Sequence, residues 1–151
     1  MKKVIIAIDS FKGSLSSFEA GESAAKGIKR IFPECEVISI PVSDGGEGLT
    51  DVLIAATSGK KVVLQAHDPL MNLRQTYYGI SGDGKTAFIE MANISGLTLV
   101  PLEQRNPMLT TTYGTGEVIK DALEHGCRNF IIGIGGSATN DAGMGMLQAL
   151  G

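Results

Sequence analysis

Three short segments of this sequence combine glycine with hydroxyl, lysine or carboxylate side chains, each at the end of an apolar, β-type run. They are residues 9–15, 43–48 and 133–141. Glycine lets main-chain amides approach an anion closely, and the amino end of a following helix carries about half a positive charge. In open α/β sheets, ligands bind at this carboxyl edge of the strands. Each segment is therefore a candidate site for an anionic ligand.

The first segment offers Lys12 as a donor to a phosphate or carboxylate, and Asp9 directly after the strand. A solvated lysine and a capping aspartate explain it equally well. The second segment places Asp44 and Glu47 among three glycines. A catalytic base or metal ligand is plausible chemistry for Asp44. A helix-capping Asp44 with Glu47 in the first turn is the competing interpretation, and position alone slightly favours it.

The third segment has the highest density of such residues, and a phosphate cradle of amides and hydroxyls fits it well. Its candidate residues are Gly135, Gly136, Ser137, Thr139, Asn140 and Asp141. Neither a Walker A sequence nor the dinucleotide-binding glycine spacing is present. The competing interpretation is a tight turn with Asn140 as the helix cap. Residues 110–117 are a fourth, weaker candidate, since threonines before a helix often only cap it.

The elements that must position these segments follow from hydrophobic periodicity. Strands are expected at 4–8, 36–42, 62–66, 74–80, 86–89 and 130–134, and helices at 18–32, 49–56, 116–125 and from 141 onward. The first strand, continuous and apolar, is predicted to be buried on both faces. Ser16 and Glu19 have the spacing of a capping box. Strand–helix–strand order predicts a parallel sheet, whereas Asp83-Gly84 between β-type runs predicts a hairpin.

Composition excludes several classes of protein. The 151 residues carry 13 basic and 16 acidic side chains, and this net charge of -3 argues against a nucleic-acid-binding surface. Cys35 and Cys127 lie far apart, so we expect two free buried thiols rather than a zinc or redox site. No apolar run is long enough for a signal peptide or a membrane span. We therefore expect a cytoplasmic protein without membrane or nucleic-acid partners.

Taken together, the motifs resemble those of the bacterial glycerate kinase family, the single-chain ATP-dependent type. The motifs begin at Asp9 (DSFKGS), Ser43 (SDGGEG), Glu90 (EMA, followed by SGL), Thr115 (TGE) and Gly133 (GIGGSATND), in the family's order. Leu49, where threonine is common, and Ala142, where a second glycine is common, are small departures. The lysine and carboxylates all remain.

The resemblance implies transfer of the ATP γ-phosphoryl group to a hydroxyl of D-glycerate, with Mg²⁺, giving phosphoglycerate (the 2-phosphate favoured) and ADP. Lys12, Asp44 and Asp141 are the implied catalytic residues, and Asp44 and Glu47 the implied metal ligands. The implied substrate- or phosphate-binding residues are Ser10, Ser14, Gly45, Gly46, Gly135, Gly136, Ser137, Thr139 and Asn140. A magnesium-dependent phosphatase and a non-catalytic anion-binding module are the alternatives.

The resemblance also implies an α/β fold with two domains, one a Rossmann-like parallel sheet and the other an inserted α/β domain containing antiparallel strands. We expect residues 1–61 to begin the first domain and 62–151 to begin the second. Members of this family are more than twice as long, so the chain is expected to be truncated relative to them. A fragment of this kind is expected to be inactive alone, and a homodimer is possible.

Overall fold

The computed structural model describes residues 2–151, which form two compact units. The first ends at Asp44 and the second is Gly45–Gly151. This division precedes the boundary expected after Lys61, because helix α2 (Leu49–Thr57) packs on strands of the second unit. The division into residues 1–61 and 62–151 concerns the two domains that the resemblance implies, and it stays a prediction.

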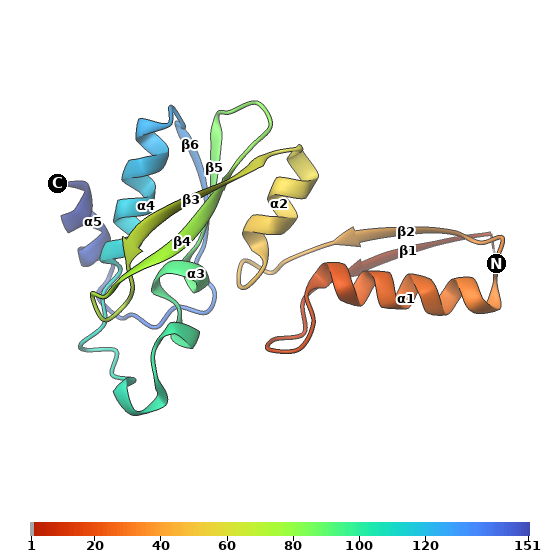
Figure 1. Ribbon diagram of the computed structural model, residues 1–151, viewed down its shortest axis with the longest axis horizontal. Helices are drawn as coiled ribbons and strands as arrows, with labels where there is room; N and C mark the ends of the chain where they lie inside the picture. Colours follow the sequence, from red (N-terminus) through yellow and green to blue (C-terminus); the bar gives the residue numbers. More distant parts are fainter. Residues whose placement is uncertain (1) are drawn as a thin grey trace. The chain divides into compact units, whose positions relative to one another are not determined.

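The first unit is a strand–helix–strand element (Figure 1). Strand β1 (Lys3–Ile8) pairs in parallel with β2 (Glu36–Pro41), and α1 (Ser17–Ile31) connects them. The capping box is confirmed: the Glu19 amide donates to Ser16 Oγ at 3.2 Å, and the Ser16 amide donates to Glu19 Oε2 at 2.9 Å. The predicted parallel pairing is confirmed as well.

The prediction that the first strand is buried on both faces is wrong for the described residues. Burial alternates along β1, and Ile5 is 60% exposed. The reason is the packing: α1 contacts β1 and β2, and the two strands form a sheet of their own. A continuous apolar run is therefore covered on alternate positions only.

The second unit contains a mixed sheet in the order β3-β4-β5-β6. Its strands are β3 (Lys60–His67), β4 (Leu73–Ile80), β5 (Thr86–Glu90) and β6 (Asn129–Gly133). Strands β3, β4 and β5 pair antiparallel, with the predicted hairpin joining β4 to β5, and β6 pairs in parallel with β5. An α/β fold with one parallel and one partly antiparallel sheet is therefore confirmed.

The second unit also contains six helices among its described residues. They are α2, α3 (Met91–Ser95), η1 (Leu97–Leu99), η2 (Leu102–Gln104), α4 (Tyr113–Glu124) and α5 (Met144–Leu150). Figure 1 shows α2 on one side of the sheet and α4 with α5 on the other. None of the described helices combines the length and apolar character that crossing a membrane needs.

Alternation along the strands explains how both faces of this sheet are covered. Tyr78, Ile80, Ala87 and Ile89 belong to one core cluster with the α4 residues Val118, Ile119 and Ala122. The intervening Gly79 lies against Ile54 of α2 and Phe88. Successive strand side chains point to opposite faces, so this stretch packs a helix on each side. Cys35 and Cys127 are both buried and free, as predicted.

The last helix begins later than predicted, and its cap is not Asn140. Helix α5 starts at Met144, with Gly143 as the residue before it, and Asp141 Oδ1 accepts the Gly143 amide at 3.1 Å. The intervening Ala142 has a φ of 52°, in the left-handed region. An L-residue there costs roughly 1–2 kcal/mol, so a glycine would adopt this conformation more easily.

We predict that Ala142→Gly in the full-length protein leaves its thermal stability unchanged or raises it. Relief of the left-handed strain outweighs or balances the greater chain entropy of glycine, about 0.5–1 kcal/mol. The matched control is Ala56→Gly in the exposed last turn of α2, which should lower stability by up to about 1 kcal/mol. Equal destabilisation by both variants in thermal unfolding contradicts the strain at Ala142.

Candidate functional site

The first and second candidate loops meet at Asp9 in the first unit. The side chain of Asp9 accepts the Ser10 amide at 2.6 Å with one oxygen and the Asp44 amide at 3.3 Å with the other. Asp9 thus links the ends of β1 and β2, although Asp44 lies 35 residues further along the chain. The side chain of Asp44 is exposed.

Lys12 and Ser14 lie in a tight turn that closes on itself. The Phe11 amide donates to the Leu15 carbonyl at 2.8 Å, and Gly13 takes a φ of 70° at its tip. Lys12 is exposed and forms no ion pair with any described residue. Its charge is therefore available to an anionic ligand.

The second and third candidate loops are in direct contact within the second unit. The Gly135 amide donates to the Gly45 carbonyl at 3.1 Å, and a Cβ at Gly135 would lie 2.7 Å from Gly46 Cα. A Cβ at Gly133 would collide with Leu49 and Gly45. Two backbones approach here more closely than any side chain allows, so both glycines serve to bring the loops together.

A buried carboxylate holds the start of α2 in place. Glu90, at the end of β5, is only 1% exposed, and its Oε2 accepts the amides of Gly48 at 3.1 Å and Thr50 at 3.2 Å. Its Oε1 has no hydrogen-bond partner among the described residues. Burial raises the pKa of Glu90, against the opposing effect of the two amides, and the charges of Asp51 and Glu47 add to the rise.

We predict that the buried Glu90 carboxylate makes the free energy of unfolding depend on pH. Since its folded pKa lies above the ordinary value of 4.5, its stabilising contribution is present at lower pH and is lost as pH rises through the folded pKa. The free energy of unfolding of the full-length protein, relative to that of Glu90→Gln, should therefore fall as the pH rises above about 4.5. Thermal unfolding across pH measures this, with exposed Glu124→Gln as the control. Stability that depends on pH in the same way in the unaltered protein and in Glu90→Gln contradicts the raised pKa.

Several polar groups of the third loop already form hydrogen bonds within the protein. The amides of Gly135, Ala138 and Thr139 donate to Gly45, Ser95 and Ser137 respectively, and Ser137 Oγ lies 2.9 Å from Thr139 Oγ1. The amides of Gly136, Ser137 and Asn140 donate to no described residue. These three amides, rather than the whole run, are the donors that an anion could use.

Asp141 is the most heavily hydrogen-bonded of the predicted site residues. Its Oδ2 accepts the Thr112 amide and hydroxyl, both at 2.8 Å, the Gly145 amide at 3.1 Å and the Thr111 hydroxyl at 3.4 Å. Burial raises its pKa, but the bonds from Thr112, Gly145 and Gly143 outweigh that effect and hold the pKa below its ordinary value. This carboxylate joins the amino ends of α4 and α5, a positioning role that sequence reasoning missed.

We predict that Asp141→Asn destabilises the full-length protein by about 1–3 kcal/mol, because an amide nitrogen cannot accept these bonds. Since the folded pKa is lowered, the stabilisation is present above the ordinary pKa and is lost as pH falls through the folded value. The difference in stability between the unaltered protein and the variant, measured by thermal unfolding, should therefore become smaller below about pH 4. A difference that stays constant or grows on acidification refutes this assignment.

The predicted metal ligands do not form a ready-made cage. Asp44 and Glu47 are both exposed, and no group of three or more metal-binding side chains exists among residues 2–151. Carboxylate oxygens are nevertheless the ligand type that Mg²⁺ prefers, and Mg²⁺ is commonly held by one or two carboxylates together with substrate phosphates. The donor chemistry of Asp44 and Glu47 fits that mode.

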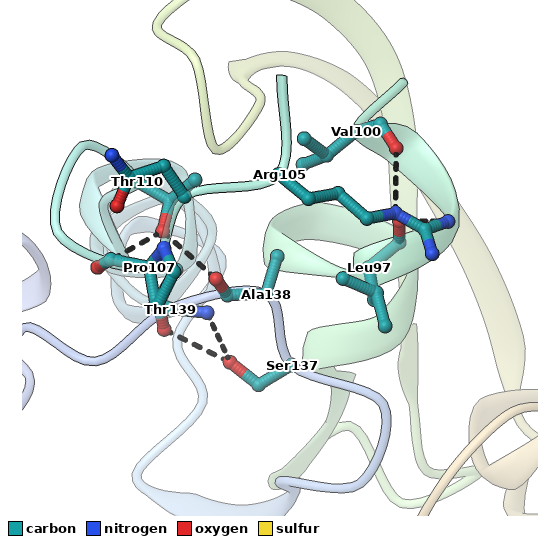
Figure 2. A pocket seen from close by; sticks show the side chains of 9 residues that line it. Leu97, Val100, Arg105, Pro107, Thr110, Ser137, Ala138 and Thr139 are labelled. Atoms are coloured by element: carbon teal, nitrogen blue, oxygen red, sulfur yellow. Dashed lines mark hydrogen bonds between the residues drawn. The ribbon is translucent and has the colours of Figure 1, made fainter. Parts of the chain in front are cut away.

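A pocket of about 220 Å³ opens beside the third loop (Figure 2). Ser137 and Thr139 line one side of it, and Arg105 extends along the other. Sequence reasoning missed Arg105, which lies in an irregular segment before Thr110. Its only signal was a charged residue beside Asn106-Pro107, ahead of the threonine run.

The glycine-rich loops lie at strand ends, pack on each other and are held by a buried carboxylate. They define an α/β protein with a candidate ligand site at the carboxyl edge of its sheet. A comparison with known families agrees with this class. The chain belongs to the glycerate kinase family, whose model matches residues 4–151.

Several relatives are closely similar to this chain. It is 55% identical to the glycerate kinase of Haemophilus influenzae and 56% identical to the glycerate 2-kinase of Escherichia coli, in each case over 99% of this chain and 39% of the relative. Among solved structures, the protein named glycerate kinase 2 from Salmonella typhimurium matches with a TM-score of 0.84 at 48% identity, covering 99% of this chain and 40% of that one. The chain thus spans about two fifths of the length of these relatives.

Proposed function

We propose that the full-length protein is a kinase that transfers the γ-phosphoryl group of ATP to a hydroxyl of D-glycerate. One structural observation carries the proposal beyond the names of the relatives. The glycine loop after Asp44 packs directly on the third loop, through the Gly135 amide and the Gly45 carbonyl 3.1 Å apart. Two loops with anion-binding chemistry therefore share one edge of the second unit.

Phosphoryl transfer depends mostly on positioning and on stabilising negative charge. In the proposed reaction, Asp44 accepts the proton of the glycerate hydroxyl as its oxygen bonds to the γ-phosphorus. The bond from that phosphorus to the bridging oxygen of ADP breaks, and ADP leaves. Lys12 supplies positive charge for the transferring phosphoryl group or the substrate carboxylate. Ser10 and Ser14 provide hydroxyl donors beside it.

The free amides of the third loop are proposed to cradle an anion, with Gly136, Ser137 and Asn140 as donors and the Thr139 hydroxyl alongside. Asp44 and Glu47 would hold Mg²⁺, which neutralises phosphate charge when bound. The resemblance implies a catalytic Asp141, as a second base or a metal ligand. Its five hydrogen bonds favour a positioning role instead.

The 2-hydroxyl is the proposed acceptor, which the name of the Escherichia coli relative supports. Cytoplasmic placement, where ATP is supplied, is part of the same proposal. A homodimer stays a prediction, which sedimentation of the full-length enzyme tests.

We predict that Asp44→Asn in the full-length enzyme lowers kcat by about 10²–10⁴, the range for loss of a general base, with thermal stability retained. ADP formation with D-glycerate measures the rate. Asp83→Asn is the matched control, because Asp83 lies in the β4–β5 turn, at the opposite end of β5 from Glu90. Near-normal turnover in Asp44→Asn removes Asp44 from the chemistry.

The same assay separates the proposed kinase from its alternatives. A kinase forms ADP only when D-glycerate is present. A magnesium-dependent phosphatase releases phosphate from phosphoglycerate without ATP, and a binding module forms no product from either. Phosphate release in place of acceptor-dependent ADP overturns the proposal.

A further inference from the structure

The pocket beside the third loop has a composition that suits a small organic acid. Its walls include the apolar residues Leu97, Val100, Pro107 and Ala138, and Arg105 is the one charged residue among those described as lining it. All of these residues belong to the second unit. A cavity with apolar walls and a single cation recognises a short carbon chain that carries one negative charge.

The guanidinium of Arg105 is fixed in place without being neutralised. Its Nε donates to the Val100 carbonyl at 3.2 Å and its Nη2 to the Leu97 carbonyl at 3.4 Å (Figure 2). No carboxylate within residues 2–151 forms an ion pair with it. A guanidinium has five N–H donors and stays charged at all physiological pH values. Three donors and the full positive charge therefore remain for a ligand.

The opposite side of the pocket supplies hydroxyl groups. Ser137 and Thr139 lie there, with their oxygens 2.9 Å apart, and Figure 2 shows both across the pocket from Arg105. The Thr110 hydroxyl donates to the Ala138 carbonyl at 2.8 Å, which holds this turn against the segment that carries Arg105. A ligand bound by the arginine thus lies close to the third loop.

The size of the pocket decides which substrate fits. A cavity of 220 Å³ corresponds to the liquid volume of about seven waters. This is below the roughly 300–1,000 Å³ of sites that hold drug-sized ligands, so the pocket suits an acid of three or four carbons better than a whole nucleotide. Arginine also matches the planar geometry of a carboxylate with two parallel hydrogen bonds.

We propose that this pocket binds the carboxylate of the hydroxy-acid substrate, with Arg105 as the counter-ion that selects acids over neutral polyols. The proposal rests on the proposed kinase function for the identity of the acid. It makes Arg105 a specificity-determining residue of the second unit.

The test compares Arg105→Met and Arg105→Lys with the unaltered full-length enzyme. We expect Arg105→Met to lower kcat/KM for D-glycerate by about 10- to 100-fold, the effect of losing a charge-assisted hydrogen bond. Glycerol lacks the carboxylate, so its kcat/KM as acceptor should not change, nor should the KM for ATP. Arg105→Lys should recover part of the loss, because it keeps the charge but not the two-pronged geometry.

Arg128→Met is the matched control. Arg128 also donates to two main-chain carbonyls, those of Leu123 at 2.9 Å and Cys127 at 2.7 Å, but it does not line the pocket. Its kcat/KM for D-glycerate should equal that of the unaltered enzyme. If Arg105→Met does not fold, as shown by thermal unfolding, the ratio of D-glycerate to glycerol activity in Arg105→Lys decides the question.

Equal losses for D-glycerate and glycerol would show that Arg105 only supports its loop, and would overturn the proposal. A raised KM for ATP with unchanged D-glycerate kinetics would assign the pocket to a phosphate and overturn it too. Failure of the kinase function would appear separately, as absence of ADP formation in the unaltered enzyme. Calorimetric titration with D-glycerate and glycerol then tests the pocket directly. No preference for the acid, or an equal preference in Arg105→Met, overturns the proposal.

Discussion

The second unit depends on a close approach between backbones at the carboxyl edge of its sheet. The buried Glu90 carboxylate accepts the first amides of α2, and Gly135 packs on Gly46 where no side chain would fit. The carboxylate is costly to bury, since one of its oxygens has no partner among the described residues. Its two amide bonds offset part of that cost and fix where the glycine loop begins.

This constraint explains why the loops combine flexible and rigid parts. Glycines at 133 and 135 permit contact between loops from distant parts of the chain, whereas Asp141 and Thr110 hold the following residues through side-chain hydrogen bonds. The amides left over, at Gly136, Ser137 and Asn140, face no such competition. The proposed anion binding would therefore use only these three amides of the polar segment.

Each unit carries one cationic side chain that the proposed chemistry uses. The first unit offers the exposed Lys12 and the second offers Arg105, and neither forms an ion pair within the described part of the chain. The proposed phosphoryl transfer from ATP to an acid involves two kinds of anion, a polyphosphate and a carboxylate. A lysine suits the first as a point charge, and an arginine suits the second through its planar fork.

Local features of the fold were predictable because they depend on near neighbours in the chain. The capping box at Ser16 and Glu19, the hairpin at Asp83-Gly84 and the strand periodicity all involve residues within a few positions of one another. The motifs of the loops also sufficed to indicate the family. The burial of β1 was not predictable, because an apolar run does not reveal how many faces will be covered.

The sequence by itself therefore determined the strands, the longer helices, the family and the loops that carry its motifs. Only the tertiary structure decided which polar groups in those loops remain available. Asp141 is occupied by donors from Thr112, 29 positions away, Glu90 reaches Gly48 across 42 positions, and Arg105 lies across a pocket from Ser137. Such pairings arise from packing between distant segments, and no local pattern of residue types encodes them.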